Sequence, residues 1–341
     1  MRIGVLTAGG DCPGLNAVIR SVTHRGITGH GDEIIGFEDG FKGLLEGRFR
    51  PLDLNSVSGI LARGGTILGS ARLERARLHE AADNVAALQA DHGIDVLIPI
   101  GGEGTLTAAR MLSDAGMPVV GVPKTIDNDI SATDRTFGFD TAVTVATEAI
   151  DRLKTTAESH QRVMVVEVMG RHAGWIALES GMAGGAHAIL LPERPFDPAD
   201  ICAMVDQRFQ RGKKFAVVCV AEGAHPIEGT MPYGHGEIDP YGHERFIGIG
   251  TRLADELAGR LGKEAKPVIL GHVQRGGVPT AYDRVLATRF GWHAVEAAHK
   301  GAFGSMTALR GNHVELVPLR DAITVLKRVP PDRMEEAESV F

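Results

Sequence analysis

The sequence predicts an α/β fold in which helices cover mostly parallel sheets, and it predicts two domains. Three observations support this. Short apolar runs alternate with amphipathic stretches, as strands alternate with crossover helices in parallel sheets. The chain has 341 residues, more than a single domain usually contains. Its 44 glycines, with only 16 prolines and no collagen-like repeat, indicate a folded backbone that turns tightly or lies close to something at many points.

The individual elements follow from the same patterns. Eight apolar runs have the length of strands, and we expect them at residues 3–6, 34–37, 96–100, 119–122, 163–168, 188–191, 215–221 and 268–270. Six stretches carry apolar residues at helical spacing, at residues 16–25, 106–115, 141–154, 198–210, 245–261 and 281–299. Residues 225–243 are rich in Gly, Pro, His and Tyr without periodicity, which predicts an irregular surface loop.

Composition argues against several classes of protein. The net charge of −7 and the lack of a long basic run argue against nucleic-acid binding. Cys12, Cys202 and Cys219 show no paired spacing, which is typical of a reduced chain, and Cys12 is better explained as a small loop filler than as a reactive thiol. We see no signal peptide and no apolar run of the ~20 residues that span a membrane. The expectation is a cytoplasmic protein without nucleic-acid or membrane partners.

Glycine-rich turns follow two of the predicted strands. Residues 9–16, GGDCPGLN, precede a helix, so their N–H groups and the helix dipole could hold a phosphate. A tight structural turn and a Rossmann dinucleotide loop stay open as alternatives, since Glu38 and Asp39 follow the second strand. In residues 100–105, IGGEGT, Glu103 stands between glycines and suits a Mg²⁺ ion that bridges phosphoryl oxygens. Alternatively it is only a favourable charge at a helix N-terminus.

Acids and cations follow three further strands. The segment PKTIDND contains Lys124, Thr125, Asp127 and Asp129, and a carboxylate there could accept the proton of an attacking alcohol. A solvated Asx turn is the alternative. Arg171 follows the strand at 163–168, where it could reach transferring phosphate oxygens or form an ordinary surface ion pair. His272 and Arg275 follow the last strand and could hold a second phosphate. Together, these loops favour phosphoryl transfer.

The segments GGDCPGLN, GGEGT, PKTIDND, MGRHAGW, AEG and LGHVQRGG occur in this order, and with them the chain resembles the phosphofructokinase family over about residues 2–327. The resemblance implies two Rossmann-like α/β domains. A larger phosphoryl-donor domain would contain residues 1–138 plus about 274–327, and a smaller fructose 6-phosphate domain would contain 139–273 plus about 328–341. It also implies a glycolytic enzyme that uses Mg²⁺ and ATP to convert fructose 6-phosphate to fructose 1,6-bisphosphate.

The resemblance assigns roles to individual positions. The catalytic positions are Asp127, as the base that takes the proton of the sugar 1-hydroxyl, with Thr125, Arg171 and Gly10. The donor-binding positions are Gly10, Phe41, Arg72, Leu73, Gly102, Glu103, Gly104 and Thr105, with Glu103 as the Mg²⁺ ligand. The sugar phosphate positions are Thr125, Asp127, Asp129, Arg162, Met169, Gly170, Arg171, Glu222, Lys266, His272 and Arg275. Arg162 and Lys266 correspond to residues that reach a neighbouring subunit's 6-phosphate, which implies a homotetramer with shared sites.

Several positions depart from the ATP-dependent bacterial pattern of the family. Glu103 replaces an Asp, which moves the carboxylate outward, and Lys266 replaces an Arg and so loses the bidentate fork. Phe41 replaces a Tyr near the nucleotide, and Leu54 replaces an effector-site arginine, which makes control by ADP or phosphoenolpyruvate doubtful. Residues 225–243 resemble an insertion, and their histidines have no regular ligand spacing, so a solvated loop is favoured over a metal site.

Two positions bear on the phosphoryl donor. Pyrophosphate-dependent members of the family typically have Asp at position 104, where it would exclude the nucleotide α-phosphate, whereas Gly104 leaves that space open. Lys124 resembles the pyrophosphate users, but a long, flexible side chain can move aside. Because exclusion is harder to evade than a missing attraction, we predict ATP as the donor. A pyrophosphate-dependent enzyme is the alternative, and a Rossmann-type dinucleotide-binding protein is the alternative from another class.

Overall fold

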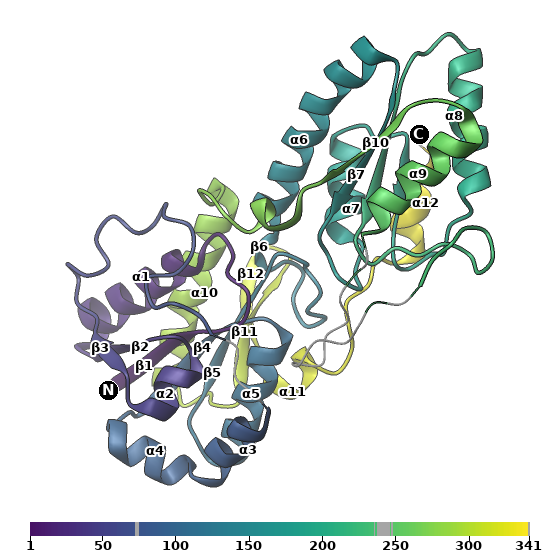
Figure 1. Cartoon of the computed structure of the whole chain (residues 1–341). Coiled ribbons are helices and arrows are strands. Elements are labelled where there is room, and N and C mark those ends of the chain that lie inside the picture. The colour runs from purple at the N-terminus through teal and green to yellow at the C-terminus, as the bar shows by residue number, and fades with distance from the viewer. Residues whose placement is uncertain (72–74, 235, 237–245, 247, 340–341) are drawn as a thin grey trace. The chain divides into compact units, whose positions relative to one another are not determined.

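Two separate β-sheets organise the chain, whose computed structural model describes residues 1–71, 75–234, 236, 246 and 248–339 (Figure 1). The chain divides into two units. The larger unit comprises Met1–Ile126, Ile130–Thr141 and Arg275–Leu326. The smaller unit comprises Asp127–Asp129, Ala142–Gln274 and Lys327–Phe341. Both units are therefore assembled from segments that lie far apart in the sequence.

The larger unit contains an eight-stranded sheet in the order β12-β11-β5-β4-β1-β2-β3, with β6 paired to β5. The strands are β1 Arg2–Thr7, β2 Glu33–Phe37, β3 Phe49–Pro51, β4 Val96–Gly101, β5 Val120–Thr125, β6 Phe137–Gly138, β11 Ser305–Arg310 and β12 His313–Pro318. Only β3 and β12, at the two edges, run antiparallel to their neighbours. Strands β4 and β5 are buried along their whole length because helices cover both faces of the sheet, and the last two residues of β5, Lys124 and Thr125, are polar.

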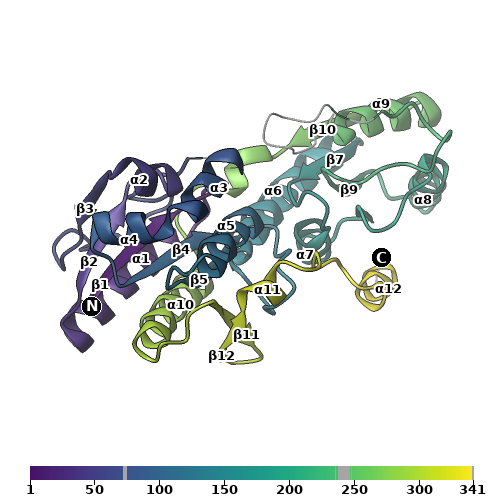
Figure 2. The same ribbon diagram turned by 90° about the horizontal axis from the view of Figure 1, so that it is seen from below.

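Helices cover both faces of this sheet (Figures 1 and 2). They are α1 Leu15–Arg25, continued by a π-helical turn at Gly26–His30, then α2 Phe41–Glu46, α3 Arg75–Asp83, α4 Val85–His92, α5 Glu103–Asp114, α10 Ala281–His299 and α11 Leu319–Ala322. Helices α1 and α10 pack against each other on one face. On the other face, α2, α4, α5 and α11 close an apolar core around Leu6, Phe37 and Leu97.

The order of strands in this sheet fixes where a ligand can bind. Strand β1 lies between β2, which follows it in the chain, and β4, which comes much later. The connections from β1 and β4 therefore leave in opposite directions, and in open parallel sheets ligands bind at the carboxyl ends of two such strands. The loops at these two ends are residues 8–14 and Gly102, which overlap the segments 9–16 and 100–105 that the sequence predicts to bind phosphate.

The smaller unit contains four parallel strands in the order β10-β7-β9-β8. The strands are β7 Val163–Val168, β8 Ala188–Leu190, β9 Ala216–Ala221 and β10 Ala265–Ile269. The helices are α6 Phe139–His160, α7 Trp175–Ala183, α8 Pro198–Gln210, α9 Ile249–Leu261 and α12 Pro331–Ser339, with a 3₁₀ turn at Gly271–Gln274. Helix α9 packs on β7 and β10, and α7 packs on β8 and β9. The first residues of α6 belong to the larger unit.

The predicted fold class is confirmed, and each of the eight predicted strands overlaps an observed strand. The last one begins three residues earlier than expected, at Ala265, because backbone pairing with Val163 extends it through a segment that is not apolar. The predicted helix at 141–154 runs from Phe139 to His160. Helix α9 begins at Ile249, and Arg245, where we expected its start, lies outside the described residues. Within residues 225–234, the described part of the expected loop, no helix or strand forms.

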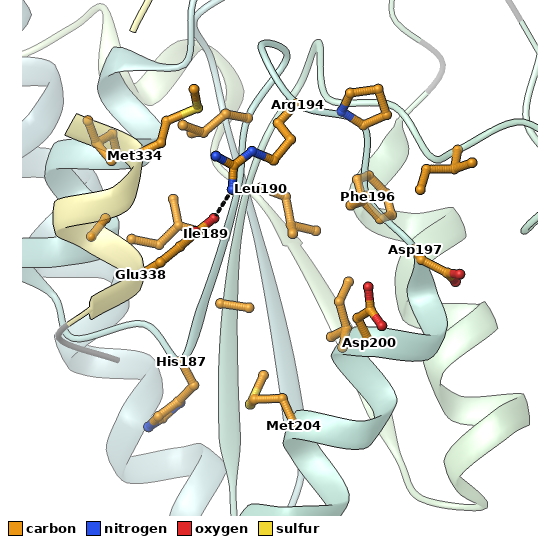
Figure 3. A pocket seen from close by; sticks show the side chains of 17 residues that line it. His187, Ile189, Leu190, Arg194, Phe196, Asp197, Asp200, Met204, Met334 and Glu338 are labelled. Atoms are coloured by element: carbon orange, nitrogen blue, oxygen red, sulfur yellow. Dashed lines mark hydrogen bonds and ion pairs between the residues drawn. The ribbon is translucent and has the colours of Figure 1, made fainter. Parts of the chain in front are cut away.

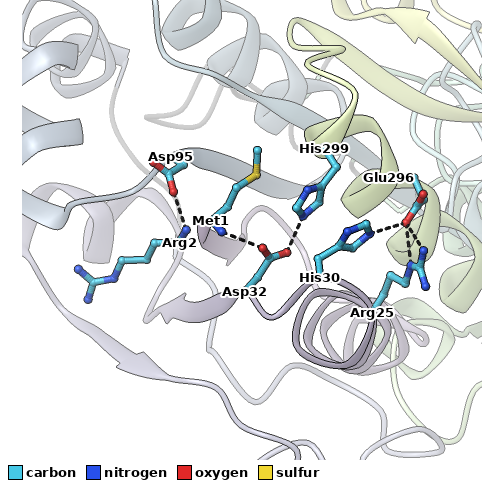
Figure 4. Close-up of polar contacts among 8 residues, drawn as sticks. All are labelled: Met1, Arg2, Arg25, His30, Asp32, Asp95, Glu296 and His299. Carbon is cyan, nitrogen blue, oxygen red and sulfur yellow. Dashed lines mark hydrogen bonds and ion pairs between the residues drawn. The ribbon is translucent and has the colours of Figure 1, made fainter.

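A chain of polar contacts ties three parts of the larger unit together (Figure 4). The buried carboxylate of Asp32 binds the Met1 ammonium at 2.9 Å and His299 Nε2 at 2.8 Å. The His299 ring stacks on the His30 ring, with centroids 3.7 Å apart. His30 Nε2 in turn contacts Glu296, which also binds Arg25. These contacts join the start of β1 to the ends of α1 and α10. In the described part of the chain, no helix is long and apolar enough to cross a membrane.

Candidate active site

The first glycine loop of the larger unit carries two cations. The Lys124 ammonium donates a hydrogen bond to the carbonyl oxygen of Gly10. Arg275 Nη1 donates to the Asp11 carbonyl at 3.2 Å, and a Cβ added at Gly10 would lie only 2.7 Å from the same nitrogen. The guanidinium therefore packs directly on this loop because position 10 has no side chain. The result is a positively charged loop at the carboxyl end of β1, the charge that a phosphate requires.

The second glycine loop opens helix α5. Gly102 is its extended N-cap residue, Glu103 and Gly104 are exposed, and Thr105 is buried. A Cβ added at Gly104 would meet nothing within 4 Å. The space beside this position is therefore open, and the protein itself would tolerate a side chain there. Phe41 is buried in the first turn of α2, whereas Arg72 and Leu73 lie outside the described residues.

Cys12 is buried within the first loop, and its sulfur faces the carbonyl oxygens of Pro13 and Phe137. Burial raises the pKa of this thiol far above its usual range. Because a nucleophilic cysteine must be a thiolate, this cysteine is a filler of the loop. The two acids of the Rossmann alternative, Glu38 and Asp39, both form ion pairs with Arg48, at 3.8 and 3.0 Å.

The smaller unit brings several predicted acids and a cation together. Asp127 is buried with 4% exposure, and Asn128 beside it has a positive φ of 52°. The backbone N–H of Arg171 donates a hydrogen bond to Glu222 Oε1 at 3.1 Å. Burial, and next the charge of Asp127, raise the pKa of Glu222 to about 7. The sequence motifs at 127, 171 and 222 thus form one electrostatically coupled group.

Two glycines shape the loop that carries Arg171. Gly170 has a φ of 140°, which favours glycine. A Cβ added at Gly223 would lie 1.9 Å from the Arg171 carbonyl oxygen, so the loops after β7 and β9 can touch only if residue 223 is glycine. These loops follow adjacent parallel strands, and their carboxyl ends meet at one edge of the sheet. Asp129 O accepts a 2.9 Å bond from Lys327 N, which holds the Asp127–Asp129 segment to the C-terminal part of the chain.

The structure adds two positioning residues that sequence reasoning missed. Gln274 is fully buried, and its side chain accepts from Met169 N at 3.4 Å and donates to the Gly271 carbonyl at 3.0 Å. Glu167 accepts a 2.7 Å bond from Gly250 N at the start of α9, and burial raises its pKa. The only local signal was their place inside the segments around Met169 and His272. Because their partners lie far away in sequence, spacing gave no indication of these bonds.

The remaining predicted residues lie at the edges of strands. Arg162 precedes β7, and Lys266 lies in β10 beside it, and both contact the carboxylate of Glu264. His272 is exposed in the turn after β10. Thr125 ends β5 in the larger unit and is buried. Arg275 also belongs to the larger unit, where it packs on the first glycine loop.

A cavity of about 390 Å³ lies in the smaller unit beside β8, α8 and α12 (Figure 3). Its lining is mainly apolar, with Ile189, Phe196 and Met334, and the Arg194–Glu338 ion pair lies against it. None of the predicted site residues in the described ranges lines this cavity. Its chemistry is unlike the loops above, since it offers an apolar surface where they offer acids and cations.

The donor set of the second loop suits a magnesium ion that is held mainly by phosphate oxygens. Mg²⁺ usually binds one or two carboxylates and completes its shell with water and substrate phosphates. Glu103 presents one exposed carboxylate between Gly102 and Gly104, and the open space at Gly104 leaves room for phosphates. Residues 1–71, 75–234, 236, 246 and 248–339 contain no cluster of three or more His, Cys, Asp or Glu side chains that could hold a metal ion.

Comparisons with known proteins agree with this arrangement. The model of the family described as phosphofructokinase matches residues 2–298. The chain is 81% identical over 341 residues, all of both chains, to ATP-dependent 6-phosphofructokinase 2 of Streptomyces coelicolor. It is 60% identical over 342 residues, again all of both chains, to a pyrophosphate–fructose 6-phosphate 1-phosphotransferase of Amycolatopsis methanolica. It superposes on Pichia pastoris phosphofructokinase in the T-state with a TM-score of 0.82 and 35% identity, over 94% of this chain and 37% of that one. The chain belongs to the phosphofructokinase family.

Proposed function

We propose that the chain transfers the γ-phosphoryl group of ATP to the 1-hydroxyl of fructose 6-phosphate. The products are ADP and fructose 1,6-bisphosphate. The relative at 81% identity is named for ATP, and the relative at 60% identity is named for pyrophosphate. Enzymes named for either donor are therefore similar in sequence to this chain over its whole length. The observation that carries the choice of ATP is the open space beside Gly104.

In the proposed mechanism, Asp127 accepts the proton of the 1-hydroxyl as its oxygen bonds to the γ-phosphorus and the bond to the ADP oxygen breaks. A carboxylate suits this role because the proton moves in the transition state of transfer to an alcohol. Arg171 and the Gly10 amide offset charge on the transferring group. Glu222 accepts hydrogen bonds from sugar hydroxyls. The burial of Asp127 supports this assignment, because water is kept away from the carboxylate and does not compete with the substrate hydroxyl for it.

Magnesium would be held by Glu103 together with phosphate oxygens of the donor. When bound, the ion supplies positive charge that neutralises the donor's phosphates. The protein residues still orient the donor: the N-terminus of α5 directs its dipole at anions, and its N-cap residue, Gly102, forms no side-chain capping bond there. Thr105 is buried behind them. Arg72 and Leu73 complete the proposed donor contacts from sequence alone.

The two units divide the work in this proposal. The larger unit binds the phosphoryl donor, and the smaller unit binds fructose 6-phosphate through Met169, Gly170, Glu222 and His272. Asp129 and Thr125 flank the base, and Arg275 supports the phosphate-binding loops. We further propose a homotetramer in which Arg162 and Lys266 of one subunit bind the 6-phosphate held by another. Their exposure at the start of adjacent strands supports this role.

Lys124 is the feature that favours pyrophosphate. Its ammonium is bonded to the Gly10 carbonyl, so it already has a resting position on the loop. An ammonium that rests on the protein does not block the nucleotide, whereas an acid at position 104 would repel the α-phosphate. For this reason we give Gly104 more weight than Lys124.

The first prediction tests the donor directly. Purified protein should turn over faster with ATP than with pyrophosphate, and the Gly104→Asp variant should lose about 100-fold or more in kcat/KM for ATP, because a like charge placed against a phosphate costs several kcal/mol. Steady-state assays with both donors measure this. Gly259→Asp is the matched control, since Gly259 is a helical glycine with equally open space on α9. Faster wild-type turnover with pyrophosphate would reject ATP as the donor, whereas unchanged use of ATP by Gly104→Asp would refute the argument from the open space at position 104.

A further inference from the structure

Glu264 holds the two cations of the proposed 6-phosphate site on one carboxylate. Its Oε2 accepts from Arg162 Nε, and its Oε1 lies 3.0 Å from Lys266 Nζ. Each oxygen of the carboxylate therefore serves one cation. Both cations lower the pKa of Glu264, so its negative charge persists. This arrangement is the one that two oxygens of a phosphate would make with the same pair of side chains.

Backbone pairing fixes the geometry of this trio. Val163 N donates to Glu264 O at 3.0 Å, and the register pairs Ala265 with Val163 and Lys266 with Met164. Arg162 and Glu264 therefore stand side by side at the start of β7 and β10. The cations stay accessible, with side-chain exposures of 31% for Arg162 and 51% for Lys266. An incoming anion can reach them without any rearrangement of the strands.

We propose that Glu264 is a specificity-determining residue that occupies the place of the 6-phosphate until the sugar phosphate displaces it. The proposal rests on the proposed function, in which Arg162 and Lys266 bind this phosphate. Displacement is feasible because ion pairs between exposed side chains contribute little to stability. A phosphate dianion carries more charge than a carboxylate and offers a third oxygen, so it competes well for the same donors.

A resident carboxylate makes the site selective. A singly charged anion is attracted to the two cations no more strongly than the carboxylate that it must replace. A phosphate dianion carries a second negative charge, so its attraction to the same cations is stronger. Glu264 should thus weaken binding of every anion but discriminate against the weaker ones. Because the 6-phosphate lies away from the reacting 1-hydroxyl and its contacts do not change in the transition state, the effect belongs to KM and not to kcat.

The second prediction follows from Glu264→Gln, which keeps the size of the side chain and removes its charge. We expect KM for fructose 6-phosphate to fall about two- to tenfold, with kcat and KM for ATP unchanged. Inhibition by added chloride, a weak anion, should become stronger by a larger factor, because the resident carboxylate discriminates most against weak anions. In Glu264→Asp, KM for fructose 6-phosphate and inhibition by chloride should stay closer to wild type than in Glu264→Gln, since the negative charge remains. Glu335→Gln is the control, because it removes one exposed carboxylate from α12 in the same unit.

Three results would overturn the proposal: a higher KM for fructose 6-phosphate in Glu264→Gln, an unchanged KM, or a change in kcat. A higher KM would mean that Glu264 orients the cations productively. Arg162→Ala and Lys266→Ala separate this outcome from failure of the proposed function. If either raises KM for fructose 6-phosphate at least tenfold, the cations bind the phosphate and the Glu264 result stands by itself. If neither does, the proposed phosphate site is wrong, whatever Glu264→Gln shows. Circular dichroism confirms that each variant is folded.

Discussion

At the scale of single residues, the carboxyl group of Glu222 changes its protonation state close to neutral pH. Burial and the charge of Asp127 raise its pKa to about 7, so the folded protein holds this proton at pH values where an ordinary glutamate has lost it. When its carboxyl group is protonated, Glu222 is a neutral and weaker hydrogen-bond acceptor. When the group is ionised, it accepts hydrogen bonds from sugar hydroxyls more strongly. Binding of the sugar should therefore weaken as the pH falls through 7.

The third prediction is a pH profile. KM for fructose 6-phosphate should rise by up to about tenfold between pH 8 and pH 6, and Glu222→Gln should remove this part of the change while raising KM overall. The phosphate of the substrate also gains a proton near pH 6. Because both proteins bind the same substrate, the difference between the wild-type and Glu222→Gln profiles gives the contribution of Glu222 without that of the substrate phosphate. Parallel profiles would show that Glu222 does not titrate in this window.

Residues in local motifs could be predicted from the sequence, but their partners could not. Asp127 and Arg171 were predicted as site residues because each follows a strand within a polar segment, and Glu222 was predicted from the resemblance to the family. The bonds of Gln274 to Met169 and of Glu264 to Arg162 join positions about 100 residues apart. Such pairs depend on strand order, which periodicity does not reveal. Arg275 illustrates the same limit, since its packing on Gly10 depends on the return of the chain to the larger unit.

At the scale of elements, the N-termini of α6 and α10 cap each other. Thr141 donates from N and Oγ1 to the buried Asp283 Oδ2, at 2.8 and 2.6 Å. Thr280 Oγ1 donates to Asp140 Oδ2 at 2.7 Å and accepts from Asp283 N at 3.3 Å. Each helix thus supplies side chains to the first turn of the other, which satisfies N–H groups that a helix end leaves unpaired. This contact anchors the start of α6 in the larger unit.

The fourth prediction concerns the stability of this cap. Burial raises the pKa of Asp283 from 3.8 to about 6. The folded state therefore binds this proton more tightly than the unfolded state, and the free energy of unfolding should fall as the pH rises from about 4 to about 6, by up to about 3 kcal/mol. Asp283→Asn keeps an acceptor oxygen for Thr141 without a charge, so this slope should flatten. Urea unfolding at both pH values measures this slope, with Asp332→Asn at an exposed position of α12 as the control.

If the slope is the same in Asp283→Asn and in the wild type, then Asp283 does not hold its proton in the fold.

The helices and strands were predicted with unequal success. Buried parallel strands were found because each is a short apolar run between polar turns. The β11–β12 hairpin was missed although it contains a Gly311-Asn312 turn, because β12 is half exposed and its alternation is weak. Helices α2, α3, α4, α7, α11 and α12 were missed because they are short or follow one another closely.

At the scale of the whole molecule, the chain passes between the two units several times, and its last segment closes the smaller one. After Leu326 the chain leaves the larger unit. Lys327 N then binds Asp129 O, and Lys327 O accepts from Trp175 Nε1, both at 2.9 Å. Val329 N donates to Glu193 Oε1 at 2.9 Å. The same carboxylate oxygen accepts from Gly174 N at 2.9 Å. The C-terminal segment thus joins the Asp127–Asp129 loop to the loop after β7.

The fifth prediction tests this C-terminal segment. Removal of residues 327–341 deletes α12 with its buried Met334 and Ala337 and leaves Glu193 without the Val329 N–H, so the thermal midpoint of the smaller unit should fall and kcat should drop as the Asp127 loop loses its anchor. Because the truncated chain could fail to fold, Val329→Pro provides a milder variant. It removes the N–H donor and replaces a buried valine side chain, so it should lower the midpoint by a few degrees. Lys327→Ala keeps both backbone bonds and loses the contact of its ammonium with the Trp175 ring, so kcat should stay near wild type. Calorimetry and steady-state kinetics measure these changes. A truncated chain with wild-type kcat would show that the base needs no support from this segment.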